Sequence, residues 1–442
     1  MYLVASDKNV KRLKFYIVDL TFSLFSLPKI YSMQKLDINF VRSQFPALSS
    51  PWVFFDNAGG TQTAKQVGNR IVDYLYNTNV QLGASYEISQ LAGERVTLAQ
   101  QQWAEAINAD DVSEVVFGSS TTALLQNLSR SLVQQFKPGD EVIVTNTDHE
   151  ANVGPWVSME QFGIVVKFWK VNPDTFSLEL DDLAELMTER TRLVAFTHVS
   201  NILGTINPVK EITKFIHSKG ALVCVDGVAY APHRIIDVTN WDVDFYVFSL
   251  YKVYGPHYSL LYGKKKYLQE LDGINHFFIG KDEIPYKLQP GNVNYELTYG
   301  SGGILTYFDE IYNQHFDDTS LAIFPRLKSV FELISLHEEE LAKPLMQFLN
   351  NKKGVSIIGE KTADKDVRVP TISFIVDNRK SSEIPLLVDP HKFGIRWGDF
   401  YARRLIDDLN LSEKDGVVRI SMVHYNTTEE VEQLITILDG IL

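Results

Sequence analysis

Cysteine is almost absent from this sequence, because Cys224 is the single cysteine among 442 residues. One thiol cannot form an intrachain disulfide, a Cys-x-x-Cys redox pair or a zinc site built on several cysteines. Cys224 also lies inside the apolar run Ala221–Gly227, which is typical of a core strand. We therefore expect neither a disulfide framework nor a metal site, and the cysteine content does not require an oxidising compartment.

An excess of positive charge is also missing. The net charge is −13, from 42 basic and 55 acidic residues, which argues against a nucleic-acid or anionic membrane partner. No Gly-x-Gly-x-x-Gly or Walker sequence follows the first predicted strand, and this disfavours a nucleotide-binding α/β protein. With 45% hydrophobic residues, the chain is expected to be a globular cytoplasmic protein with room for two or three domains.

The first 32 residues are considered separately. A basic segment at 8–14 precedes an apolar stretch at 15–27, an order found in signal peptides. Asp19 interrupts the stretch, no small-x-small cleavage site follows it, and it is too short to span a bilayer as a helix. We favour a start site assigned too early, with Met33 as the first residue. A disordered extension and an export signal are the alternatives.

Between residues 114 and 263 the sequence alternates short apolar runs with stretches of helical periodicity. The apolar runs predict six strands, at Glu114–Phe117, Glu141–Asn146, Ile164–Val171, Leu193–Ser200, Ala221–Gly227 and Phe245–Leu250. One helix is predicted at Thr121–Phe136, and a second begins at Pro208, with Asn207 as its cap and Gly220 at its end. Apolar strands joined by helices indicate a mostly parallel sheet in an α/β domain.

Beyond about residue 305 the pattern becomes richer in helix. Helices are predicted at Arg326–Leu341 and Pro344–Asn351, and a strand at Thr371–Val376. Thr427 and Glu430 form a capping box that opens a final helix. The expected organisation is an extension at 1–32, a segment at 33–52 that packs on the small domain, a large domain at 53–304, and a smaller α+β domain at 305–442.

Four of the apolar runs are followed by a polar residue, namely His149, Asn201, Asp226 and Lys252. Ligands of parallel α/β sheets bind at the carboxyl ends of the strands, so these side chains are expected to share a site. A buried lysine can form a Schiff base with an aldehyde, and a buried aspartate can keep a pyridine nitrogen protonated. Lys252 and Asp226 together therefore point to pyridoxal 5'-phosphate, although either residue alone would more often be a surface lysine or a turn aspartate.

A series of short motifs surrounds these residues. In chain order they are Phe54-Phe-Asp-Asn-Ala-Gly-Gly60, Gly118-Ser-Ser-Thr-Thr122, Asp148-His-Glu-Ala-Asn152, Ser200-Asn-Ile-Leu-Gly204, Val225-Asp-Gly-Val-Ala229, Ser249-Leu-Tyr-Lys252, Pro290-Gly-Asn-Val-Asn294 and Val418-Arg-Ile-Ser421. The series resembles class V aminotransferases of fold type I, and most closely their cysteine desulfurase/selenocysteine lyase-like branch. The resemblance runs from about residue 40 to the C-terminus. It implies a large domain with a mostly parallel sheet flanked by helices, and a smaller α+β C-terminal domain.

The resemblance also implies roles for individual residues. Lys252 would form the Schiff base and move the substrate Cα proton, Asp226 would hold the pyridine nitrogen, and His149 would stack on the ring. Arg419 would bind the α-carboxylate of a small amino-acid substrate, because a guanidinium stays charged and binds a carboxylate through two donors. Asn201 would lie near the cofactor and the substrate carboxylate.

The cofactor phosphate has its own set of implied ligands. Hydroxyls and backbone amides at a helix N-terminus form an anion site, and the matching residues here are Ser120, Thr121 and Thr122, with Ser249 as a further hydroxyl. An ordinary cluster of helix-capping residues is the alternative interpretation. Asn292 matches residues that reach the phosphate of a neighbouring subunit, which implies a homodimer with shared active sites.

Three departures from the family pattern concern the chemistry. Tyr401 stands about where desulfurases carry a mobile cysteine, and Cys224, on a core strand, cannot replace that thiol. Ala229 stands where a glutamine or histidine binds the cofactor phenolic oxygen, unless Tyr230 or a water substitutes for it. Tyr251 replaces the histidine that usually precedes the Schiff-base lysine. Similar combinations occur in a subgroup described as cysteine desulfurase-like, which lacks the loop cysteine.

The sequence thus predicts an enzyme that uses pyridoxal phosphate to act on the Cα or Cβ of a small amino acid, without forming a persulfide. Lyase, epimerase or racemase, and transaminase outcomes stay open, because the pocket walls that select among them are not visible in the sequence. A protein that binds the cofactor with little turnover and serves a partner or regulatory role is the alternative. The complete set of Lys252, Asp226 and Arg419 argues against it, since a regulator does not need a substrate clamp.

Overall fold

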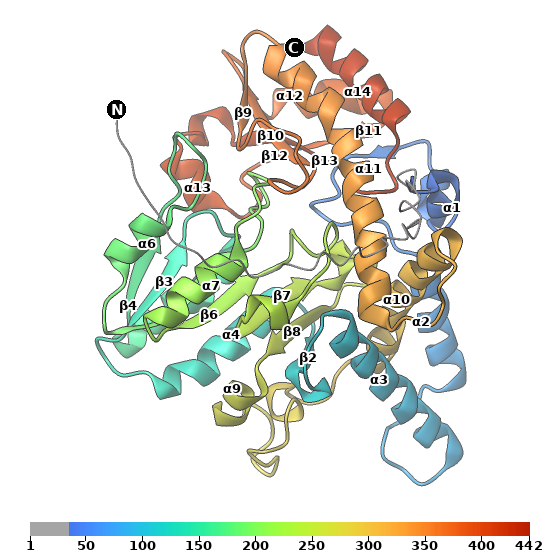
Figure 1. Cartoon of the computed structure of the whole chain (residues 1–442), viewed down its shortest axis with the longest axis vertical. Helices are drawn as coiled ribbons and strands as arrows, with labels where there is room; N and C mark the ends of the chain where they lie inside the picture. The colour runs from blue at the N-terminus through green and yellow to red at the C-terminus, as the bar shows by residue number, and fades with distance from the viewer. Residues whose placement is uncertain (1–34) are drawn as a thin grey trace, which may run out of the picture. The chain divides into compact units, whose positions relative to one another are not determined.

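The computed structural model describes residues 35–442, which form one compact unit. The predictions for residues 1–32 lie outside this described part. At its centre is a seven-stranded sheet in the order β2-β8-β7-β6-β5-β3-β4 (Figure 1). The strand bounds are β2 Val115–Gly118, β3 Glu141–Thr145, β4 Val165–Trp169, β5 Thr191–Thr197, β6 Leu222–Asp226, β7 Phe245–Ser249 and β8 Ser259–Gly263.

All six strands predicted between residues 114 and 263 are present, with their ends shifted by a few residues. The pairs from β4 through β3, β5 and β6 to β7 are parallel, whereas β8 runs antiparallel to both β7 and β2. Strand β8 was not among the predictions. The mostly parallel α/β fold is therefore confirmed, with one antiparallel strand inserted near an edge of the sheet.

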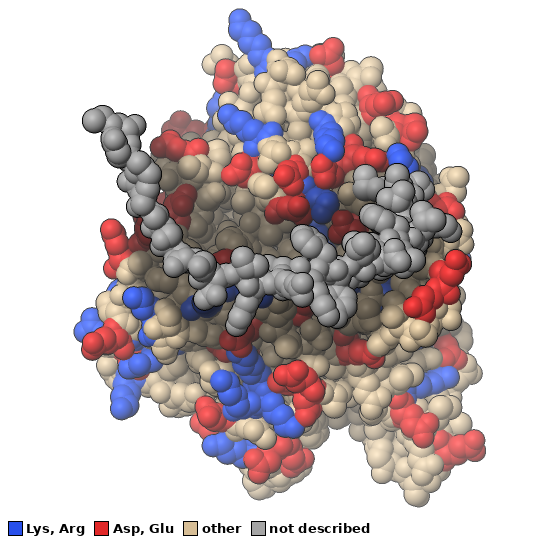
Figure 2. Space-filling model, in the orientation of Figure 1, with Lys and Arg blue, Asp and Glu red and all other residues tan. Residues whose placement is uncertain are grey.

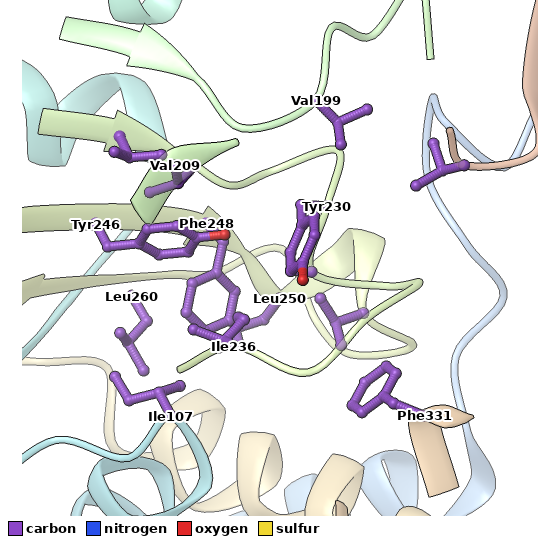
Figure 3. Packing of buried hydrophobic residues seen from close by; sticks show 14 of the residues in the cluster. Ile107, Val199, Val209, Tyr230, Ile236, Tyr246, Phe248, Leu250, Leu260 and Phe331 are labelled. Carbon is purple, nitrogen blue, oxygen red and sulfur yellow. The ribbon is translucent and has the colours of Figure 1, made fainter. Parts of the chain in front are cut away.

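Both faces of this sheet are covered, as the uninterrupted apolar strands require. On β6, Val223 and Val225 belong to one core cluster, and Cys224 between them belongs to another. The second cluster includes α4 (Thr121–Leu132), whereas the first includes α3 (Glu87–Ala106), α7 (Val209–Ser218) and α10 (Tyr295–His315). Figure 3 shows part of the first cluster, with Phe248 and Leu260 from the sheet near Ile107 and Phe331 from the helical layer.

A second sheet is antiparallel, with the order β12-β13-β10-β9. Its strands are β9 Val355–Ile358, β10 Thr371–Val376, β12 Arg396–Gly398 and β13 Val417–Ser421. Helices α11 (Ile323–Asn351) and α14 (Thr428–Ile441) cover it through a third core cluster, and Figure 1 shows α11 running from this sheet alongside α10. A short parallel pair joins β1 (Val53–Phe54) to β11 (Phe393–Gly394). The smaller C-terminal α+β layer is thus confirmed.

Two helix predictions were wrong in detail. The two helices expected at 326–341 and 344–351 are one helix, α11, with Pro344 inside it. The buried stripe of Leu341, Leu345 and Leu349 continues across the proline, so packing outweighs the lost backbone hydrogen bond. Asn207 is not the cap of α7: the N-cap is Pro208, and the Asn207 side-chain amide nitrogen donates to the carbonyl of Thr197 at 2.8 Å.

The C-terminal helix has the expected capping box. The Thr427 side chain accepts from the backbone of Glu430, and the Glu430 side chain accepts from the backbone of Thr427. Arg42, which ends the short helix α1 (Ile38–Arg42), ion-pairs with the same Glu430 at 2.8 Å. The division into domains at 53–304 and 305–442 stays a prediction, and residue 304 lies within the continuous helix α10.

The surface carries charge of both signs. Figure 2 shows lysine and arginine interspersed with aspartate and glutamate on the visible face, rather than gathered into one basic area. Within residues 35–442, no helix is long and apolar enough to cross a membrane. That part of the chain also contains no group of three or more His, Cys, Asp or Glu that could hold a metal ion.

Candidate active site

One cavity lies at the carboxyl ends of β3, β5, β6 and β7 and encloses about 530 Å³ of empty space, part of it open to solvent. Parallel strands end at the same edge, so residues that follow different strands meet there. The predicted residues that line the cavity are Ser120, Thr121, Thr122, His149, Asn201, Asp226, Ser249 and Lys252. The structure thus brings together eight of the ten predicted site residues, and Arg419 and Asn292 are not among those that line the cavity.

Lys252 ends a short turn, Leu250–Lys252, which directly follows β7. It is only 7% exposed. Burial lowers the pKa of its amine to about 8, and the positive charge of Arg419 acts in the same direction. About a tenth of the amine is therefore unprotonated at pH 7, far more than for an ordinary lysine, and this is the form that attacks a carbonyl carbon or accepts a proton.

Asp226 is the last residue of β6, and its carboxylate accepts a hydrogen bond from the Val228 amide at 2.8 Å. Burial raises its pKa to about 6, so the carboxylate is largely ionised at neutral pH and ready to pair with a buried cation. The next residue has to be glycine. A Cβ on Gly227 would lie 2.1 Å from the buried Tyr246 ring, so a side chain at this position would clash with that ring.

Hydroxyl groups gather at the N-terminus of α4. Ser120 caps the helix by accepting from the Ala123 amide at 3.1 Å, and Thr121 contacts the Ser249 hydroxyl at 2.7 Å. Ser259, at the start of β8, lies 3.3 Å from both of those hydroxyls. The positive end of the α4 dipole and these donors make this end of the cavity suited to an anion.

His149 opens a short turn beyond β3, and its Nδ1 accepts from the Ala151 amide at 3.0 Å. Burial and the charges of Lys252 and Arg419 lower its pKa to about 4, so the imidazole is neutral at pH 7. The ring centroid lies 5.2 Å from that of Tyr401, at an interplanar angle of 39°. A neutral, half-buried ring at the cavity wall can stack on a planar ligand.

Arg419 lies on β13 of the antiparallel sheet and contacts the backbone of Asn201. Its guanidinium donates to Asp56 Oδ1 at 2.9 Å and to the Asn201 carbonyl at 3.2 Å. The Asn201 amide nitrogen donates to the Phe400 carbonyl at 2.9 Å. Two buried atoms, Arg419 Nε and Asn201 Oδ1, have no hydrogen-bond partner in the structure. Buried polar atoms are rarely left unpaired, so this end of the site has hydrogen-bonding capacity for a ligand.

Sequence reasoning did not find the two residues that hold Arg419 in place. Asp56 bonds to its guanidinium, and Phe400 packs against it with the Arg419 Cζ 3.7 Å from the ring centroid. Asp56 lies in the motif Phe54–Gly60, which could have drawn attention to it as the only acidic residue of that motif. Phe400 carries no sequence signal of this kind, because a phenylalanine in a loop is ordinary.

Ala229 and Tyr251, which differ from the family pattern, and Tyr230, the possible substitute for the missing side chain at 229, have different surroundings. Tyr230 does not line the cavity, because its ring stacks on His198 with the centroids 3.5 Å apart; Figure 3 shows it among apolar side chains. Ala229 and Tyr251 do line the cavity. Tyr251 is thus the tyrosine available at this wall, and Tyr230, the substitute considered from the sequence, is engaged elsewhere.

Cys224 and Asn292 lie away from the cavity. The thiol of Cys224 is buried, which raises its pKa well above the usual range. It therefore has little thiolate character. Asn292 is exposed in the loop that precedes α10.

A second buried carboxyl group, Asp148, was missed by the sequence analysis. It accepts from the Asn152 amide at 2.7 Å and from the Thr197 backbone at 3.1 Å, and it also bonds to the Thr145 hydroxyl. Burial raises its pKa to about 8, and the nearby charge of Asp226 acts in the same direction. The position of Asp148 directly before His149 could have drawn attention to it as a residue near the site. Asp148 ties the ends of β3 and β5 together beneath the site.

Replacing Asp148 with asparagine should change how stability depends on pH. The folded protein holds a proton at Asp148 up to about pH 8, whereas an unfolded aspartate releases it near pH 3.9. The proton on Asp148 therefore stabilises the folded state. This contribution to the free energy of unfolding is fully present below about pH 4 and is lost as pH rises through about 8. Relative to Asp148→Asn, wild type should therefore lose at least about 1.4 kcal/mol, the equivalent of one pKa unit, between about pH 5 and 8.5. Urea unfolding of both proteins measures this, and parallel pH profiles would contradict it.

The donor set fits pyridoxal 5'-phosphate. The hydroxyls at the α4 N-terminus suit the phosphate, Asp226 suits a protonated pyridine nitrogen, and the Lys252 amine suits the aldehyde. The unpaired Arg419 Nε and Asn201 Oδ1 suit an amino-acid ligand beside the cofactor. Each functional group of the cofactor thus has a chemically matched residue at this cavity.

Comparison with known proteins agrees with this fit. A family model described as "Aminotransferase class-V" matches residues 53–434. The "Aminotransferase-like protein FGM3" of Gibberella zeae is 43% identical over 93% of this chain and 100% of its own length. The "Cysteine desulfurase-like protein ustD" of Aspergillus flavus is 33% identical over 92% of this chain and 91% of its own.

A solved structure is similar over nearly the same length. The cysteine desulfurase CsdA from Escherichia coli superposes with a TM-score of 0.77 at 25% identity, covering 91% of this chain and 98% of that one. The chain belongs to the class V aminotransferase family of pyridoxal 5'-phosphate-dependent enzymes, in its cysteine desulfurase-like branch.

Proposed function

We propose that this enzyme acts on the Cα or Cβ of a small amino acid and does not form an enzyme persulfide. The observation that supports this most directly is the meeting of Lys252 and Asp226 at one cavity, with Arg419 behind it. Pyridoxal phosphate, when bound, supplies an electron sink that stabilises negative charge at the substrate Cα. The residues of the chain then decide which proton moves and how the substrate is held.

Each residue has a defined task in this proposal. The Lys252 amine, with its pKa near 8, takes the Cα proton and returns it. The ionised Asp226 keeps the cofactor nitrogen protonated, and the neutral His149 stacks on the ring. Arg419 binds the substrate carboxylate through its unpaired Nε, while Asp56 and the Asn201 carbonyl fix the other two nitrogens. The hydroxyls of Ser120, Thr121, Thr122 and Ser249 bind the phosphate.

The exclusion of a persulfide rests on the thiol. A persulfide needs a thiolate that reaches the substrate sulfur. Cys224 is buried in the second core cluster with a raised pKa, and Tyr401 lies in the loop near His149 instead of a cysteine. Lyase, epimerase or racemase, and transaminase outcomes all begin with removal of the Cα proton, and the proposal covers each of them.

The test is the absorption spectrum of the purified protein, before and after a panel of small amino acids that includes L-cysteine. We expect a band at about 410–430 nm, as for a lysine–pyridoxal phosphate adduct, which shifts with particular amino acids. Product analysis then assigns the reaction. A protein that stays colourless with added pyridoxal phosphate would overturn the proposal, and sulfide release from L-cysteine that stops in Cys224→Ala would overturn the exclusion of a persulfide.

We also propose a homodimer with shared active sites. Large apolar side chains are exposed on α2 (Lys65–Asn77), on α3 and in the loop before Asn292, including Tyr76 (82% exposed), Phe277 (99%) and Phe278 (67%). A second copy would remove such side chains from water, and the exposed Asn292 could then reach the partner's site. Light scattering should give about twice the chain mass of 50.2 kDa. A monomer at micromolar concentration would contradict this.

A cytoplasmic location also stays a proposal. It is compatible with the acidic composition and with the buried, unpaired thiol of Cys224. Fractionation of cells that produce the protein tests it.

A further inference from the structure

The segment Gly398–Ala402 packs directly against the residues assigned to the substrate carboxylate. Phe400 and Tyr401 are consecutive, and both have left-handed backbones, with φ of 50° and 61°. Side chains other than glycine rarely adopt this conformation, and two in succession persist only where surrounding contacts impose them. Asp399, within the segment, accepts from the Tyr401 amide at 3.0 Å, and further contacts come from active-site residues.

Two backbone carbonyls of this segment are held by active-site groups. The Asn201 amide nitrogen donates to the Phe400 carbonyl at 2.9 Å. The Glu150 backbone amide, next to His149, donates to the Tyr401 carbonyl at 2.7 Å. The left-handed turn therefore has a fixed position relative to both Asn201 and His149.

The Phe400 ring packs against Arg419, the residue proposed to bind the substrate carboxylate. Its ring centroid lies 3.7 Å from Arg419 Cζ, closer than any other pairing of an arginine or lysine with an aromatic ring in the described part of the chain. Phe400 is 9% exposed and Arg419 is 2% exposed. The ring thus excludes water from one side of a guanidinium whose Nε has no partner.

We propose that Phe400 is a specificity-determining residue, which makes the site selective for substrates that carry a carboxylate. A guanidinium shielded from water attracts a carboxylate more strongly than a hydrated one, because the local dielectric is lower. The aromatic face also stabilises the cation in its present orientation. With its left-handed backbone, Phe400 makes both contacts at once: its ring lies over Arg419 and its carbonyl accepts from Asn201. This inference rests on the proposed function, in which Arg419 binds the carboxylate.

The test compares each amino acid that shifts the spectrum of the wild-type holoenzyme with its amide, which lacks the carboxylate. Dissociation constants come from absorbance titrations and need no turnover. Phe400→Gly removes the ring and retains a residue suited to the left-handed backbone. We expect roughly ten-fold weaker binding of the amino acid, as for loss of a desolvated cation–π contact, and less than about two-fold change for the amide.

Two further variants separate the ring from the backbone. Phe400→Ala also lacks the ring but is strained at positive φ, so it should bind like Phe400→Gly and unfold at a lower temperature. Tyr401→Gly changes the neighbouring left-handed residue, and it should keep the wild-type preference for the amino acid over the amide. The thermal unfolding temperatures of the three variants report whether each one folds.

Several results would overturn the inference. It fails if Phe400→Gly binds the amino acid as tightly as wild type, or loses the amino acid and the amide equally. It also fails if Phe400→Ala alone weakens binding, because backbone strain would then be the cause. A wild-type protein that binds the cofactor and responds to no amino acid would instead contradict the proposed function.

Discussion

Lys252→Ala should abolish the absorption band of the bound cofactor and lower turnover by at least roughly 10⁴-fold, because in the proposed function Lys252 both attaches the cofactor and is the base for the Cα proton. Among residues 35–442, Lys252 is the only lysine that lines the cavity, and its pKa near 8 suits both tasks. The measurements are the visible spectrum after dialysis and the rate with the best amino acid of the panel. Retention of the band in the variant would show that another lysine holds the cofactor.

Lys252→Arg is the matched control for charge. A guanidinium keeps the positive charge beside Asp226 but stays protonated, so it is neither a nucleophile nor a base. We expect the same loss of band and turnover as in the alanine variant. Lys266→Ala, at a position on α9 (Lys265–Glu270) away from the cavity, should behave as wild type. Activity in the arginine variant would mean that only the charge at residue 252 matters.

Asp226→Asn should lower kcat by roughly 10²–10³-fold, the size of effect seen when one preorganised charge-stabilising group is removed. The amide oxygen can still accept from the Val228 amide, at the 2.8 Å contact seen for Asp226, so the strand end keeps its shape. What is lost is the negative charge that holds the proton on the cofactor nitrogen. Attachment of the cofactor at Lys252 should persist, so the visible band remains while turnover falls.

The pH dependence of cofactor binding distinguishes this effect from a general loss of structure. In the wild-type apoprotein the Asp226 carboxylate has a pKa of about 6, so affinity for the protonated ring should fall as pH drops through that value. Asp226→Asn has no carboxylate there and should lose this pH dependence. Equal profiles for the two proteins, or wild-type kcat in the variant, would contradict the role given to Asp226.

The sequence predicted much of the fold and of the site, for a physical reason that concerns strand ends. Short apolar runs such as Ala221–Gly227, separated by helical stretches, are typical of strands covered on both faces, and such strands form a parallel sheet with helices between them. Parallel strands share one carboxyl edge, so Asp226, Ser249 and Lys252 had to approach one another. No long-range information is needed for that conclusion, and the cavity is lined by these three residues.

Local rules failed where packing between distant segments decided the outcome. Pro344 was predicted to separate two helices. Helix α11 nevertheless continues through it, because the apolar stripe of α11 packs on the antiparallel sheet. Asn207 was predicted to cap α7, yet the N-cap is Pro208, and the Asn207 side-chain nitrogen donates to the carbonyl of Thr197. Strand β8 was not predicted, although it completes the sheet between β7 and β2. Of the three, Pro344 is the case in which packing against a segment remote in sequence outweighed a local preference.

By itself, the sequence determined the α/β architecture, the family and the lysine–aspartate pair, because those follow from periodicity and from motifs within single segments. The tertiary structure alone decided how Arg419, the residue proposed to bind the substrate carboxylate, is held in place. Asp56 and Arg419 meet across 363 residues, and Asn201 and Phe400 across 199. Such contacts depend on how the antiparallel sheet docks on the strand ends of the large one. Docking of this kind is set by the summed packing of two cores, and no local pattern encodes it.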